Sequence, residues 1–293
     1  MLTYTIDTAT AGTPLLDYLQ QEISLAQASY LNRLIRSGKV LCNGESTTAG
    51  QILRAGDTIT LPGSRKLISL IERQARQPQI LYESDKILVV AKPSGLATHS
   101  SRGHEQDNLN ERVREMLLAR GKKFKTAAIH RLDLPTSGPV IFGKGQKAIS
   151  ELGKLMQQRG IEKKYLALTL AGLPKQGRLQ GTLDSKGKTK VAECDYRVIT
   201  QNDEIALHEI VLGTGRQHQI RRQMAEVGFP IAGDKRYRGP DLPGLNRLFL
   251  HAFALTFTDP FGNEAIKIKD PLPDDLTQLL EHYDLSCPDT NKY

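Results

Sequence analysis

Cysteine is scarce in this sequence, which has only Cys42, Cys194 and Cys287 among its 293 residues. The three lie far apart and form no CxxC pair, so neither a disulfide framework nor a cysteine-rich zinc site is expected. Free thiols are typical of a reducing compartment, so we expect a cytoplasmic protein.

Long apolar segments are also missing. No uncharged run approaches the length of about 18 residues that a membrane-spanning helix needs. The opening stretch, MLTYTIDTATAGTPLL, has neither a basic start nor a long apolar segment. The sequence therefore predicts no membrane span and no signal peptide.

Motifs for metals and organic cofactors are absent as well. The histidines include no HExxH pattern, and His130, His208, His218 and His251 lack the spacing of metal ligands. The GTG stretch at 213–215 lacks the third glycine of a dinucleotide-binding fingerprint. We therefore expect a reaction that needs no metal and no cofactor.

Positive charge is what the chain has in excess. Its formal net charge is +8 and its pI is about 9.3, which indicates a polyanionic partner. The charge is uneven, because residues 1–63 carry a net charge of −1 and the remaining 230 carry +9. A nucleic acid would be bound mainly by the larger part. The length of the chain favours two domains.

Residues 1–62 are expected to form a small α/β domain. Thr13-Pro14 predicts the start of a helix over 14–23, and a second helix is expected over 27–37. Strands are expected over 39–42 and 58–61. Residues 63–79 are then expected to form a linker.

The stretches RLIRSGKVLCNG and AGDTI resemble the RNA-binding module first described in ribosomal protein S-four, over about residues 12–62. The resemblance implies that Arg33, Arg36 and Lys39, on or just after the second helix, contact RNA phosphates. The alternative is an ordinary solvated helix face, which the acidic total of this part also fits.

Residues 80–293 are expected to form the larger domain. Strands are predicted over 80–82, 87–91, 139–142, 162–172, 192–199, 205–211, 248–257 and 265–268, and helices over 108–119, 146–158, 216–227 and 273–283. Strands outnumber helices and alternate irregularly with them. We therefore predict an α+β fold with a mixed, largely antiparallel central sheet and flanking helices.

One stretch of this domain, HRLDLPTSG at 130–138, concentrates chemistry in a short loop. Its only carboxylate is Asp133, and the Pro, Thr, Ser and Gly that follow break any regular element. An aspartate is ionised at neutral pH and suits a nucleophile or base better than an acid. The alternative is a structural ion pair between Arg131 and Asp133 that closes a turn.

Three distant stretches accompany this loop: KKY at 163–165, TGRQHQIRRQMAEVGFPIAGDKRY at 214–237 and LHA at 250–252. Together with HRLDLPTSG they resemble the RluA-type family of RNA pseudouridine synthases, over about residues 80–270. The resemblance implies a pseudouridine synthase-like fold and an isomerisation in which a uridine is detached from its ribose, turned and rejoined through carbon 5. No atoms are gained or lost, which fits the missing cofactor motifs.

The resemblance also implies catalytic roles. Asp133 would be the nucleophile, and Arg221, the last arginine of the HQIR stretch, would supply the counter-charge that keeps a buried carboxylate ionised. Tyr165 would stack on the uracil and lie near carbon 5 as a base. Its alternative is an ordinary core tyrosine.

Five further residues are expected to bind the substrate by the same resemblance. Leu250 would line the base pocket, with plain core packing as its alternative. Arg131 would fill the gap that the uridine leaves when it swings out of the RNA. His130, Arg216 and His218 are expected near the pocket or the phosphates.

Two other functions stay open from the sequence. The first is a non-catalytic RNA-binding or ribosome-assembly protein on the same scaffold. The second is a hydrolase that uses Asp133, although a second acid at identifiable spacing is missing. The expected partner is structured ribosomal or transfer RNA, and the expected oligomeric state is a monomer.

Overall fold

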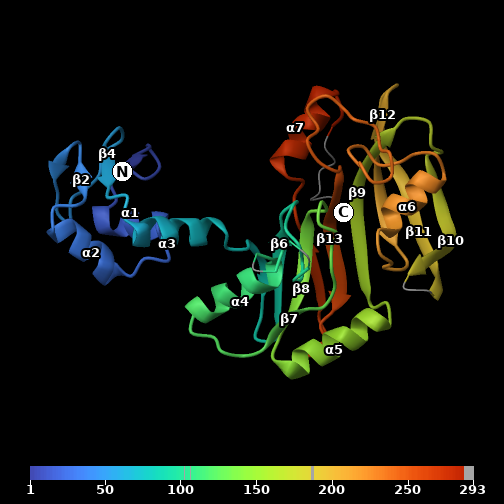
Figure 1. Ribbon diagram of the computed structural model, residues 1–293, viewed down its shortest axis with the longest axis horizontal. Helices are drawn as coiled ribbons and strands as arrows, with labels where there is room; N and C mark the ends of the chain where they lie inside the picture. The colour runs from blue at the N-terminus through green and yellow to red at the C-terminus, as the bar shows by residue number, and fades with distance from the viewer. Residues whose placement is uncertain (102, 106, 186–187, 287–293) are drawn as a thin grey trace. The chain divides into compact units, whose positions relative to one another are not determined.

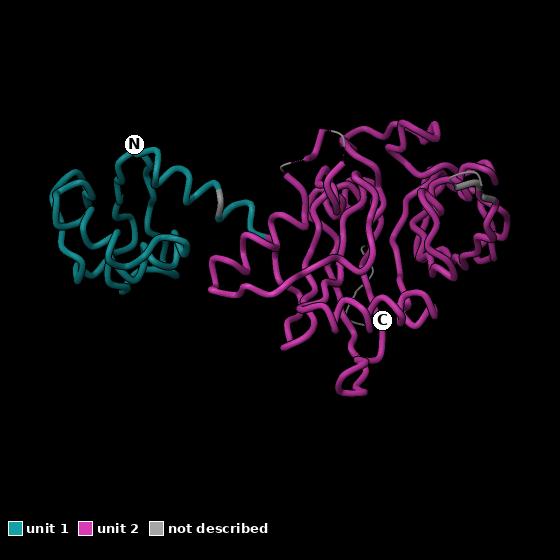
Figure 2. Tube along the Cα trace, turned by 60° about the horizontal axis from the view of Figure 1, so that its bottom comes forward, with its two compact units in different colours: residues 1–77 teal, residues 78–293 magenta. Residues whose placement is uncertain are grey.

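The computed structural model describes residues 1–101, 103–105, 107–185 and 188–286. Cys287, the third of the expected free thiols, lies outside these residues. The chain divides into two compact units, Met1–Gln77 and Pro78–Tyr293 (Figure 2).

The first unit is a small α/β domain. It contains the helices α1 (Leu15–Glu22), α2 (Ala28–Arg36) and α3 (Arg65–Ala75), and the strands β1 (Leu2–Thr5), β2 (Leu41–Cys42), β3 (Glu45–Ser46) and β4 (Thr58–Leu61). The strands form one antiparallel sheet in the order β1-β4-β2-β3. Leu15 and Leu19 of α1 are fully buried, because they repeat on one helical face. The predicted helices over 14–23 and 27–37 are confirmed.

Residues 63–79, expected as a linker, instead contain α3. The hydroxyl of Ser64 accepts a hydrogen bond from the Leu67 amide at 3.3 Å and so caps the helix. Leu67 is fully buried in the core of the first unit, with Leu70 and Ile71 packed against it. The spacing of these three apolar residues is helical, so the segment packs as a helix as far as Ala75, two residues before the end of the first unit at Gln77.

The second unit is built on two sheets (Figure 1). The four-stranded sheet has the order β5-β6-β8-β7, and the six-stranded sheet has the order β10-β11-β12-β9-β13-β14. The strands are β5 (Ile80–Glu83), β6 (Ile87–Lys92), β7 (Thr126–Ala128), β8 (Gly138–Lys144), β9 (Ile161–Leu170), β10 (Gln176–Ser185), β11 (Lys188–Gln201), β12 (Ile205–Leu212), β13 (Leu250–Thr258) and β14 (Ala265–Lys269). All the paired strands run antiparallel, and the predicted α+β class is confirmed.

Helices cover both faces of these sheets. α4 (Leu109–Ala119) and α6 (Gln219–Glu226) pack in the core cluster that contains Tyr165 and Ala167 of β9. On the opposite face, α7 (Asp274–His282) packs against Leu166 and Leu168 of the same strand. α5 (Gln146–Gln157) packs in a further cluster with β6 and β8. Tyr165 and Ala167 of β9 thus point toward the α6 side, and Leu166 and Leu168 toward the α7 side, as strand alternation requires.

The hairpin of β10 and β11 is longer than the sequence indicated. No strand was predicted over 176–185, and only 192–199 was expected of β11. The two strands nevertheless pair continuously from Gln176–Arg197 to Ser185–Lys188. Gly177 and Gly181 weaken the local strand signal, so cross-strand pairing decides the conformation here. A Cβ on Gly177 would lie 2.7 Å from the Tyr196 hydroxyl, so the glycine makes room for that ring.

A parallel bridge between Ser137 and His251 links the loop before β8 to β13. The Ala252 amide donates to the Ser137 carbonyl at 2.8 Å. Gly138 follows at φ 134°, and a Cβ at this position would overlap the carbonyl of Ala252. The bridge joins the two sheets directly after the stretch that contains Asp133.

Among the residues that the structure describes, no helix is both long enough and apolar enough to cross a bilayer.

Replacing Gly138 by alanine tests the importance of this bridge. The added methyl group would displace β13 or the loop, so we expect the free energy of unfolding of the second unit to fall by about 1–3 kcal/mol. Chemical denaturation measures the effect. Gly181→Ala is the matched control, because nothing lies within 4 Å of a Cβ there. Equal stability of the two variants would contradict a tight junction.

Candidate active site

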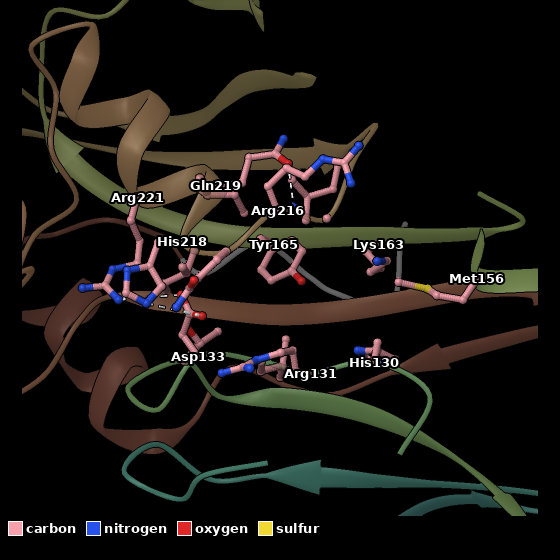
Figure 3. A pocket seen from close by; sticks show the side chains of 17 residues that line it. His130, Arg131, Asp133, Met156, Lys163, Tyr165, Arg216, His218, Gln219 and Arg221 are labelled. Carbon is pink, nitrogen blue, oxygen red and sulfur yellow. Dashed lines mark hydrogen bonds and ion pairs between the residues drawn. The ribbon is translucent and has the colours of Figure 1, made fainter. Parts of the chain in front are cut away.

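A pocket of about 360 Å³ opens beside Asp133 in the second unit. Its walls come from the loop between β7 and β8, from β9, from the loop before α6 and from Leu250 of β13 (Figure 3). The lining includes eight residues predicted as site residues: His130, Arg131, Asp133, Tyr165, Arg216, His218, Arg221 and Leu250. A volume of this size lies within the range of small-ligand sites.

Residues at the end of β6 and directly after it hold the Asp133 loop in place by hydrogen bonds. The ammonium of Lys92 donates to the Leu134 carbonyl at 3.2 Å and to the Leu96 carbonyl at 2.7 Å. Ser94 Oγ donates to the Pro135 carbonyl at 2.8 Å. Burial lowers the pKa of Lys92 to about 7, although the negative charge of Asp133 opposes this shift. The bonds to Leu134 and Pro135 fix the backbone directly after Asp133.

The carboxylate of Asp133 faces a cation. Arg221 Nη1 lies 3.6 Å from Asp133 Oδ2, and the side chain of Asp133 keeps 17% of its surface exposed. Among the described residues, its ion-pair contacts are Arg221 and His218, and none is made with Arg131. The structural ion pair with Arg131 that the sequence left open is therefore not formed.

Arg221 is held by a second aspartate, Asp234. Its Nε and Nη2 donate to the two carboxylate oxygens of Asp234, both at 2.7 Å. Asp234 is fully buried and also accepts from the amides of Arg236 and Tyr237, at 3.1 and 3.2 Å. Burial lowers the pKa of Arg221, but the bonds to Asp234 outweigh it and leave that pKa raised. The guanidinium is therefore a fixed charge beside Asp133.

His218 stands at the start of α6 in a left-handed conformation, with φ 53°. Its Nε2 lies 3.8 Å from Asp133 Oδ1, and its Nδ1 lies 3.1 Å from the Tyr237 hydroxyl. Burial lowers the pKa of His218, and the charge of Asp133 partly offsets this. His218 is thus a polar neighbour of both the carboxylate and Tyr237.

The helix predicted over 216–227 begins later, at Gln219. The Gln219 side-chain oxygen accepts from Thr214 Oγ1 at 2.7 Å and from the Arg216 amide at 3.0 Å. These bonds keep the preceding residues in a loop, which becomes one wall of the pocket. Helical propensity is overridden here by side-chain bonds to the backbone.

Tyr165 and Leu250 form the apolar side of the pocket. Both are buried, at 6% and 3% exposure, and both line the cavity. Burial raises the pKa of Tyr165 well above its usual range, and the nearby charge of Asp133 adds to the shift. The phenol of Tyr165 is therefore protonated at neutral pH.

The other three predicted substrate residues differ in exposure. His130 is buried, and its Nε2 accepts from the Ile141 amide at 3.2 Å. Burial, assisted by the charge of Lys163, lowers the pKa of His130 to about 3, so the ring is neutral. Arg216 Nε donates to the Val191 carbonyl at 3.1 Å, and Arg131 is exposed at the pocket.

The positions Asp234, Tyr237, Lys163 and Lys92 were assigned no role from the sequence. Asp234 and Tyr237 lie in the GDKRY part of the longest matched stretch, and Lys163 opens the KKY stretch. The GDKRY and KKY motifs are therefore the sequence signal that points to Asp234, Tyr237 and Lys163. Their contacts with Arg221 and the pocket depend on pairings between segments far apart in the chain.

The residues predicted to bind RNA in the first unit lie on or just after α2. Arg33, Arg36 and Lys39 are all exposed. The guanidinium of Arg33 lies 5.6 Å from the centre of the Tyr30 ring, and the Lys66 ammonium lies 4.4 Å from it.

No group of three or more potential metal ligands occurs in the part of the chain that the structure describes.

Comparison with known proteins connects this geometry to a family. A family model described as RNA pseudouridylate synthase matches residues 86–226. The ribosomal large subunit pseudouridine synthase C of Escherichia coli O157:H7 is 32% identical over 305 residues, covering 92% of this chain and 93% of the relative. The synthase D of Xanthomonas campestris pv. campestris is 30% identical over 277 residues, covering 86% and 83%.

A solved structure shows the same fold. Human RNA pseudouridylate synthase domain containing 4 superposes with a TM-score of 0.62 at 22% identity, covering 75% of this chain and 98% of that one. The predicted fold is confirmed by this neighbour. Since the curated relatives match over nearly the whole chain, the protein belongs to the RluA-type RNA pseudouridine synthases, a family of isomerases that act on RNA.

Proposed function

We propose that the protein isomerises a uridine in large-subunit ribosomal RNA to pseudouridine, with Asp133 as the nucleophile. The observation that carries the proposal is the partly exposed carboxylate of Asp133, 3.6 Å from the fixed guanidinium of Arg221 in a pocket of nucleotide size. The names of the relatives, which are ribosomal large subunit synthases, favour ribosomal over transfer RNA.

The geometry leaves Asp133 reactive. Arg221 directs its two short bonds to Asp234 and offers only a longer contact to Asp133. The positive charge therefore favours the ionised carboxylate without fully occupying its oxygens. This arrangement suits attack at the anomeric carbon or at the ring, and equally removal of a ribose proton.

The apolar side of the pocket would hold the base. Stacking of uracil on Tyr165 contributes on the order of 1–3 kcal/mol. The raised pKa of Tyr165 keeps the phenol protonated, which favours a role in stacking on the base over a role as a general base. Arg131, exposed at the pocket, would fill the vacancy in the RNA and offset an extrusion cost of a few kcal/mol.

A basic surface of the second unit would hold the surrounding RNA. A groove between the end of α4 and β7 is lined by Arg114, Lys122, Lys123 and Lys125 together with Phe124, without any acidic side chain among its lining residues. The three lysines and Phe124 are exposed. Cations bind phosphates, and an exposed ring stacks on unpaired bases. Arg33, Arg36 and Lys39 of the first unit would add contacts to phosphates.

The first test concerns the nucleophile. Asp133→Asn removes the charge but keeps the shape, so we expect tritium release from RNA labelled at uridine carbon 5 to fall by roughly 10³-fold or more. RNA affinity should remain, since the phosphate contacts are intact. Asp85→Asn, at an exposed turn between β5 and β6, is the matched control. Equal release by Asp133→Asn and the control would overturn the proposed function.

A second test concerns the support of Arg221. In Asp234→Asn the buried guanidinium loses its partner, which we expect to cost about 3–5 kcal/mol of stability. Arg221 is then free to pair closely with Asp133, so the single-turnover rate should also fall. Denaturation and rapid-quench kinetics measure the two effects. Asp195→Asn breaks a solvent-exposed pair with Arg178 and should change stability by less than about 1 kcal/mol.

A third test concerns the basic groove. Replacing Lys122, Lys123 and Lys125 together by glutamine should weaken RNA binding. The slope of log affinity against log salt concentration should become less steep by roughly 2–3, since each lost phosphate contact contributes about 0.7–0.9 to the slope. The rate at saturating RNA should stay the same, because the pocket is untouched. The control replaces the exposed Lys147, Lys175 and Lys267 in the same way. If both triple variants bind alike, the groove is not an RNA site.

A further inference from the structure

Lys163 is a buried cation at the far end of the pocket. It lies on β9 two residues before Tyr165, so both side chains project from the same face of the strand. Lys163 is only 7% exposed and lines the pocket with His130, Met156 and Gly215. Figure 3 shows Asp133, His218 and Arg221 on one side of Tyr165 and Lys163 on the other.

The ammonium of Lys163 has no partner in the described part of the chain, which distinguishes it from two other lysines whose side chains are little exposed. Lys92 donates to three carbonyls, and Lys144 pairs with Glu83 at 2.9 Å. Lys163 makes neither a hydrogen bond nor an ion pair there. Burial lowers its pKa to about 8, and no carboxylate opposes the shift. A largely buried cation without a partner costs stability, so a ligand bound in the pocket is the natural partner for Lys163.

The spacing on β9 identifies the ligand atom. Side chains two residues apart on a strand are separated by about 6.6 Å, which is close to the width of a pyrimidine ring. A base that stacks on Tyr165 therefore presents its edge to Lys163. The polar acceptors on that edge of uracil are its carbonyl oxygens. A Cβ at Gly215 would lie 3.4 Å from Lys163 Nζ, so the glycine leaves the ammonium free to reach the base.

We propose that Lys163 donates a hydrogen bond to a carbonyl oxygen of the extruded uracil and stabilises the base while it is detached. This proposal rests on the proposed function. When the bond between the ribose and the base nitrogen breaks, its electron pair stays on the base and is delocalised onto the carbonyl oxygens. The pair is used again when carbon 5 forms the new bond to the ribose. A cation at the carbonyl is worth most in the detached state.

A phosphate of the RNA is the competing ligand for an ammonium, and kinetics separates the two. A phosphate contact would exist in the bound RNA before the base enters the pocket, so its loss would weaken RNA affinity. A carbonyl contact forms only after extrusion and strengthens as charge develops. Its loss should lower the rate at saturating RNA and leave affinity unchanged.

The experiment compares Lys163→Met with Lys164→Met. Lys164 is the next residue, points to the opposite face and lies 3.6 Å from Glu162. We expect Lys163→Met to lower the single-turnover rate by roughly 10²-fold, with RNA affinity unchanged. Lys164→Met should behave as the wild type. A wild-type rate for Lys163→Met, or weaker RNA binding at an unchanged rate, would overturn the proposal.

The pH profile provides a readout that a structural role would not change. The wild-type rate should fall above about pH 8, because Lys163 then loses its proton. Arginine keeps its charge, so Lys163→Arg should lose this alkaline limb. The other charged or titratable groups that line the pocket are His130, Arg131, Asp133, Tyr165, Arg216, His218 and Arg221. An alkaline limb that persists in Lys163→Arg would assign it to one of these groups and overturn the proposal.

Thio-substituted RNA tests the contact from the side of the substrate. Sulfur is a weaker acceptor than oxygen, so 2-thiouridine or 4-thiouridine at the target should slow the wild type and leave Lys163→Met without a further loss. Equal slowing of both enzymes by each substitution would overturn the contact. Asp133→Asn is measured in every assay. Activity that persists in Asp133→Asn refutes the proposed function, whereas equal rates for Lys163→Met and Lys164→Met refute only this inference.

Discussion

The bidentate pair between Arg221 and Asp234 is the constraint on which the site depends. Both side chains are buried, and each of the two bonds is 2.7 Å long. A buried guanidinium needs such a partner, and its planar geometry fixes where the remaining nitrogen points. That nitrogen points toward Asp133, which therefore meets a positive charge that Asp234 holds in place. The carboxylate gains electrostatic support without a tight bond of its own.

A second constraint comes from the junction of the two sheets. The loop of Asp133 belongs to the four-stranded sheet, whereas Arg221, Tyr165 and Leu250 belong to the six-stranded sheet and its helix. The parallel bridge at Ser137 holds this loop against β13, and the bond from Lys92 to the Leu134 carbonyl holds it against the end of β6. The pocket is thus formed by two sheets, which meet where Gly138 closely approaches Ala252.

Much of the fold was predictable, because its signals are local. The helices α1, α2, α4, α5 and α7 begin and end within one residue of their predicted limits, since apolar spacing and capping involve neighbours within a turn. β10, with its glycines, and α3, taken as a linker, were missed. Their conformations depend on a paired strand and on a core that the local sequence does not contain. The late start of α6 has the same origin, in the bonds of Gln219.

The sequence by itself determined the class of fold, the excess of positive charge and the family, because motifs and periodicity are properties of consecutive residues. Tertiary structure alone decided that Arg221 makes its short bonds to Asp234 and only a longer contact to Asp133, that Arg131 makes no pair with Asp133, and that Lys163 is buried without a partner among the described residues. These relations depend on distance and solvent exclusion. Both are set by strand register and sheet packing between segments that are remote in the chain.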